Sequence, residues 1–76
     1  MIHARESYNR IQDPAGKIPE DEPVFLLRAQ DAAAGATVRA WADLNAELGG
    51  DPELSRLARE HAAKMDAWHF HKPADL

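Results

Sequence analysis

The shortage of large apolar side chains is the feature that most constrains how this chain can fold. The sequence has 76 residues, of which 45% are apolar, but fifteen of the apolar residues are alanine. A chain below about 80 residues seldom buries enough apolar surface to be stable without disulfides, a metal ion or a partner subunit. Because the sequence has no cysteine, we expect one small domain that is supported by self-association into a homo-oligomer.

Charge and hydropathy restrict the classes of function. Thirteen acidic residues against nine Lys and Arg give a formal net charge of -4, so direct DNA binding is not expected. No apolar run is longer than the four residues Val24 to Leu27, which argues against a membrane span and a signal peptide. We therefore expect no membrane association and a cytoplasmic location.

Prolines shape the first part of the chain. Three of the five prolines lie within residues 1–23, so we predict an extended or irregular arm there. The acidic triplet at 20–22 lies between Pro19 and Pro23; it is either a solvated turn or a mimic of nucleic-acid phosphates toward a basic partner. The apolar run at 24–27 is typical of a buried extended segment or a short strand.

Start and stop signals predict two helices, over residues 32–48 and 52–69. Asp31 is a candidate N-cap for the first helix, and Gly49-Gly50 ends it. Asp51-Pro52 is a second start signal, with an acidic cap and proline at the first helical position. We predict an all-α fold with an extended arm over 1–23, an antiparallel two-helix hairpin within 24–69, and a flexible tail over 70–76.

Large apolar residues recur on one stripe of each predicted helix. Val38, Trp41, Leu44 and Leu48 are spaced by three, three and four, and Leu54, Leu57, His61, Met65 and Trp68 by three, four, four and three. These spacings predict packing stripes in the core or at a subunit interface. The predicted interface residues are Val38, Leu44, Leu48, Leu57, Met65 and Trp68.

The start of the first predicted helix is a candidate anion site. Residues 32–36 have almost no side chains, so an anion could approach the free N–H groups at the positive end of the helix dipole. Arg28 and Arg39 could bind a phosphate, Trp41 could stack on a base, and Gln30 and Asp31 complete the candidate ligand set. Alternatively, the small residues allow close packing against another helix, and Asp31 as a cap repels anions.

The histidines allow two interpretations. His61 lies on the apolar stripe of the second helix, either as a ligand contact or pH-sensitive interface residue, or as a hydrogen-bonded core histidine. His69 and His71 have only a weak metal-site spacing, because no Cys or nearby acid completes a ligand set. No thiol, serine motif or glycine-rich phosphate loop is present, so we expect neither an enzyme nor a metal or cofactor.

Three segments carry a resemblance: an EPVFxLRxxD pattern at 22–31, VRxWA at 38–42 and AxxMxxW at 62–68. With them, residues 22–68 resemble short uncharacterised helical proteins encoded by bacteriophages and prophages. The resemblance implies a binding protein that counters host antiviral defence in the host cytoplasm. Such a protein would act by sequestering a nucleotide signal, or else as an acidic inhibitor of a nucleic-acid-binding defence complex. A purely structural assembly protein is the remaining alternative.

Overall fold

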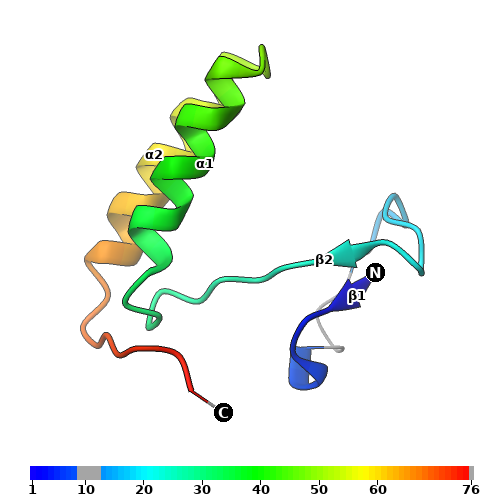
Figure 1. Ribbon diagram of the computed structural model, residues 1–76, viewed down its shortest axis with the longest axis horizontal. Helices are drawn as coiled ribbons and strands as arrows, with labels where there is room; N and C mark the ends of the chain where they lie inside the picture. The colour runs from blue at the N-terminus through cyan, green and yellow to red at the C-terminus, as the bar shows by residue number, and fades with distance from the viewer. Residues whose placement is uncertain (9–12, 76) are drawn as a thin grey trace.

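The computed structural model describes residues 1–8 and 13–75. Along the chain lie strand β1 (Ile2–His3), the 3-10 helix η1 (Glu6–Tyr8), strand β2 (Pro23–Val24), and the helices α1 (Ala34–Glu47) and α2 (Pro52–Asp66). The helices form one part of the molecule, and the arm with its two strands lies to one side of them (Figure 1). The two predicted helices are confirmed, but the all-α class is wrong in one respect, because the arm contains a small sheet.

The sheet has two parallel strands of two residues each. Ile2 lies opposite Pro23 and His3 opposite Val24, and the Ile2 amide donates to the Glu22 carbonyl at 2.8 Å. The beginning of the arm is therefore hydrogen-bonded to the segment before α1. Two-residue strands leave no alternating pattern in the sequence, so periodicity could not reveal this pairing.

Helix α1 begins two residues later than predicted. Ala33, not Asp31, is the N-cap, and the Asp31 carboxylate accepts from the Ala33 amide at 2.9 Å in the turn before the helix. The Ala32 amide donates to the Lys72 carbonyl at 2.8 Å, so the tail is hydrogen-bonded to the backbone just before the helix. At the other end, Gly49 has a φ of 79°, which confirms the predicted left-handed stop after Leu48.

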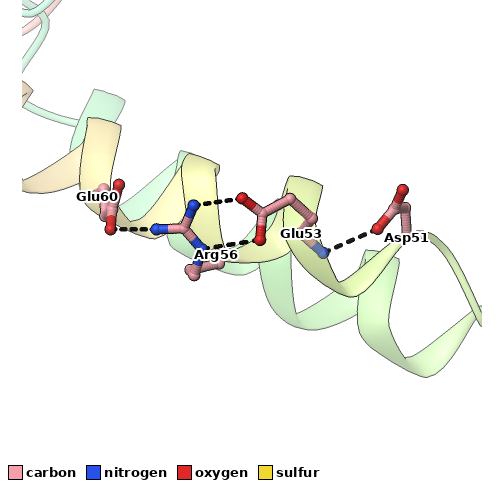
Figure 2. A network of polar contacts seen from close by, with 4 residues as sticks. All are labelled: Asp51, Glu53, Arg56 and Glu60. Carbon is pink, nitrogen blue, oxygen red and sulfur yellow. Dashed lines mark hydrogen bonds and ion pairs between the residues drawn. The ribbon is translucent and has the colours of Figure 1, made fainter.

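Helix α2 begins where the sequence predicts. Asp51 is the N-cap and accepts from the Glu53 amide at 2.9 Å, with Pro52 at the first helical position. Figure 2 shows this cap and the ladder beside it, in which Arg56 pairs with Glu53 and Glu60. The Arg56 guanidinium holds the pKa of the Glu53 carboxyl below its usual value.

The end of α2 differs from the prediction. The helix stops at Asp66 and not at 69, and the His71 ring lies 3.1 Å from the Met65 carbonyl. Lys72 then forms a parallel bridge with Asp31, and its amide donates to the Gln30 carbonyl at 2.8 Å. The tail was predicted to be flexible, but its described part is hydrogen-bonded to the segment before α1, which draws the chain away from the helix axis.

Small residues form the contact between the two helices. We define the interhelical seam as its buried members: Ala34, Gly35, Ala42, Ser55, Ala62 and Met65. The Ser55 hydroxyl donates to the Ala42 backbone carbonyl at 3.1 Å and accepts from the Asn45 side-chain amide at 2.9 Å. A side chain on one helix can reach the backbone of the other only because the helices approach closely, and alanine and serine permit that approach.

Ion pairs flank the seam on the outside. Arg39 of α1 pairs with Asp66 at the end of α2, and Asp43 pairs with Arg59 at 2.8 Å. Both pairs are about half exposed, so each contributes less than about 1 kcal/mol. They join residues that this register of the two helices places opposite each other. Within the described residues, neither helix is long and apolar enough to cross a membrane.

The predicted packing stripes are offset from the seam. Val38 is half-buried and Met65 is buried, whereas Trp41, Leu44, Leu48, Leu57 and Trp68 are exposed, with Leu48 at 85%. No large side chain is completely buried among the described residues. Of the two predicted alternatives, the core is therefore not where Trp41, Leu44, Leu48, Leu57 and Trp68 lie, because the close approach of the backbones excludes them. The predicted subunit interface stays a prediction.

Candidate functional site

The arm, the segment before α1 and the tail surround a cleft of about 340 Å³. We call it the arm–tail cleft. Its lining residues are Arg5, Tyr8, Phe25, Leu26, Arg28, Gln30, Asp31, Lys72, Ala74 and Asp75. The volume lies at the lower end of the range for small-molecule sites, about 300–1,000 Å³.

Three backbone segments hold the cleft in shape. The segment before α1 is joined to the tail by the bridge between Asp31 and Lys72. The arm is joined to the same segment through β1 and β2, and Arg5 donates to the Asp75 carbonyl. The cleft therefore depends on contacts between residues as far as 70 positions apart in the sequence.

Cations outnumber carboxylates in the cleft, although the whole chain has a net charge of -4. Lys72 pairs with the Asp75 carboxylate at 2.9 Å, and this contact holds the pKa of Asp75 below its ordinary value. Arg28 is exposed, and within residues 1–8 and 13–75 it takes part in no ion pair. Its guanidinium is thus able to bind an added anion without first breaking an ion pair with those residues.

Two aromatic rings lie among these charges. Phe25 follows β2 and is 73% exposed, an unusually open position for a phenylalanine. Tyr8 is half-buried at the end of η1, with the Arg5 guanidinium 5.8 Å from its ring centroid. An exposed aromatic face beside cations is a combination that binds ring-bearing anions, since the ring stacks and the cation pairs with the charge.

The structure brings together three of the six predicted ligand residues. Arg28, Gln30 and Asp31 all line the arm–tail cleft. They lie close together because they fall within four positions of the segment that connects β2 to α1, where the backbone is also bonded to the tail. These three residues remain candidate ligand contacts.

Arg39 and the small-residue start of α1 do not belong to this cleft. Arg39 is paired with Asp66, and a side chain added at Gly35 would overlap the Asp66 carboxylate. Ala34 and Gly35 are buried in the seam. The first turn of α1 is therefore occupied by packing against the end of α2, as the alternative to the anion site predicted.

Trp41 and His61 lie in a different place. They line a groove of about 410 Å³ together with Val38, Leu54, Leu57, Ala58, Glu60 and Lys64, which we call the outer groove. His61 is exposed in the single chain, so it is not the buried core histidine of one predicted alternative, and the interface alternative stays a prediction. Neither residue can contact a ligand in the arm–tail cleft.

Sequence reasoning missed the other residues that give the cleft its chemistry. Arg5 and Tyr8 lie in the arm and Lys72 and Asp75 in the tail, both regions that were predicted to lack regular structure. Phe25 was assigned to a buried segment, yet it is exposed. The only sequence signal for this site was Phe25, three positions before Arg28 in the segment that connects β2 to α1. Nothing in the sequence of the arm or of the tail indicates that these two regions meet.

The candidate site is therefore defined by its geometry: a cleft with an exposed arginine that has no ion pair among the described residues, two further cations and an exposed aromatic ring. The prediction of a relationship to phage-encoded proteins remains a prediction. No family model, no curated protein and no solved structure matches this chain.

Proposed function

We propose that this is a non-enzymatic binding protein that captures a nucleotide in the arm–tail cleft. The observation that carries the proposal is the exposed Arg28, which forms no ion pair within the described residues and lies in the same cleft as the exposed Phe25. A phosphate is the anion that an arginine fork binds best, through paired N–H donors. A nucleobase is the ring most suited to stacking on Phe25.

The remaining residues of the cleft fit the two ends of such a ligand. Arg5 and Lys72 extend the cationic part, and a phosphate would compete with Asp75 for both of them. Gln30 offers both a donor and acceptors to a base edge, and Asp31 offers a carboxylate. One oxygen of that carboxylate already accepts from the Ala33 amide, so the other is the one available to a base amino group.

The biological role that we propose rests on the resemblance described above. A small protein of a mobile element that binds a nucleotide tightly would lower the concentration of a signal on which host antiviral defence depends. Binding without turnover is sufficient for this role, and it requires no catalytic group. Neutralising the signal then depends only on affinity and on the amount of protein.

Calorimetric titration tests the binding directly. We expect saturable binding of AMP, ADP or a cyclic mononucleotide, and weak or no binding of adenosine, because the phosphate supplies the charge. Arg28→Ala should weaken binding about tenfold or more, since a hydrogen bond to a charged group contributes about 1.5–3 kcal/mol. Phe25→Ala should also weaken it, by removing the stacking surface.

Lys17→Ala is the matched control, because it removes one exposed positive charge outside the cleft. It should bind like the parent protein. Absence of binding by the parent to every nucleotide tested would refute the proposal. Equal loss in the Arg28 and Lys17 variants would show that only the overall charge matters.

A further inference from the structure

We propose that a second copy of this chain docks on the outer groove, so that two hairpins form a four-helix dimer in which the two α2 helices run in opposite directions. The groove combines Val38 and Trp41 of α1 with Leu54, Leu57 and His61 of α2. It is open to solvent in the single chain, where Trp41 is 48% exposed. The proposal is independent of ligand binding in the arm–tail cleft.

The apolar residues left exposed on the hairpin form a surface that a partner could cover. Leu44 and Leu48 continue the Trp41 stripe along α1, and Leu54 and Leu57 lie beside it on α2; each of these leucines is about half exposed or more. Together with Trp41 they form an exposed apolar surface of the kind that marks protein–protein contact sites.

The interhelical seam buries too little apolar surface to stabilise the chain by itself. Its members are mostly alanine, and no large side chain is completely buried in the described chain. A single chain of this size with so small a core has a low free energy of unfolding, and small proteins without disulfides are commonly stabilised by self-association. Closing two outer grooves against each other would bury the tryptophan and leucines that the seam excludes.

The charges on α2 identify a second copy as the occupant. Asp51 and Glu53 make the start of α2 acidic, and Glu53 shares Arg56 with Glu60, so this cluster keeps a negative charge in excess. Lys64 lies on the rim near the end of α2 and forms no ion pair within residues 1–8 and 13–75. A two-fold axis that crosses α2 between Leu57 and Glu60 brings Lys64 of one copy to Glu53 of the other. The groove is therefore complementary to itself, as a two-fold interface must be.

Sedimentation velocity of the full chain tests the dimer. We expect a dimer at micromolar protein, and a helical monomer for Leu57→Glu, which places a charge at the centre of the contact. Phe25→Glu is the matched control, since Phe25 is a large exposed apolar residue on the arm–tail cleft; it should remain dimeric. A monomeric parent protein, or a Leu57→Glu variant that stays dimeric, overturns the proposal.

A charge exchange keeps the test decisive even if Leu57→Glu fails to fold. Lys64→Glu changes only an exposed rim residue, and we expect the dimer dissociation constant to rise about tenfold. Adding Glu53→Lys should restore the affinity, because it re-creates the opposite charges across the two-fold axis; Glu53→Lys alone controls for the loss of its pair with Arg56. An unchanged constant in Lys64→Glu overturns the proposed arrangement. Calorimetry on the Leu57 and Lys64 variants should show unaltered nucleotide binding, which separates this proposal from the proposed function.

Discussion

The hairpin and the arm–tail region are held together by different kinds of contact. In the hairpin, two regular helices meet along buried alanines, and one serine hydroxyl crosses between them. In the arm–tail region, two-residue strands and a single bridge join segments that are far apart in the sequence. Substitutions in the first region should therefore change the free energy of unfolding, whereas substitutions in the second should change binding and local order.

The largest effect should come from enlarging a seam residue. Ala42 is completely buried and its carbonyl accepts from Ser55, so Ala42→Leu has no space for three additional carbons. Overpacking of this kind costs about 1–3 kcal/mol, and we expect the upper part of that range in urea unfolding followed by circular dichroism. Ala40→Leu, at an exposed position of the same helix, should change stability by less than about 0.5 kcal/mol. Equal stability of the two variants would contradict a close-packed seam.

A smaller effect should follow from removing the polar bond across the seam. Ser55 is 2% exposed, and Ser55→Ala removes the hydroxyl oxygen that accepts a part-buried hydrogen bond from the Asn45 side-chain amide. We expect destabilisation by about 1 kcal/mol, the usual net contribution of a hydrogen bond. Ser7→Ala in the exposed η1 should have no measurable effect on thermal unfolding. A stabilised Ser55→Ala protein would show that helix propensity outweighs this bond.

The smallest effect concerns the tail. Lys72 holds the pKa of Asp75 below its ordinary value of 3.8, so the folded pKa lies below the unfolded one. The stabilisation by this contact is therefore complete above the unfolded pKa and is lost as the pH falls through the folded pKa. Because both side chains are exposed, we expect only a local change: Asp75→Asn should speed amide exchange at Lys72, while Asp21→Asn should not. An Asp75 carboxyl that titrates at its ordinary value by NMR would contradict the contact.

The parts of the fold that depend on local chemistry could be predicted. Gly49 after α1, and Asp51 with Pro52 before α2, indicate where one helix ends and the next begins, since caps act within one turn. The same reasoning failed at the start of α1 and the end of α2. At both ends the helix boundary depends on where the tail lies, because the tail is hydrogen-bonded to the segment before α1. The residues near each boundary do not encode that long-range contact.

The candidate site was predictable only in part, for a similar reason. Arg28, Gln30 and Asp31 lie in one continuous segment, so sequence proximity was enough to group them. Trp41 and Arg39 were grouped with them by helical distance, but α1 directs them to the outer groove and to Asp66. Arg5 and Lys72 reach the cleft through the pairing of strands and bridges, which joins residues with no local signal.

By itself, the sequence determined that the chain forms two helices separated by a glycine turn, and that few large apolar residues are available for a core. Only the tertiary structure decided which stripe of each helix faces the other. Neighbouring stripes of α1, one through Ala42 and one through Trp41, both repeat at the helical period, so periodicity cannot choose between them. Because the two backbones approach closely, only the stripe of small residues fits between the helices. The tryptophan and leucines remain on the surface, where a second chain can cover them.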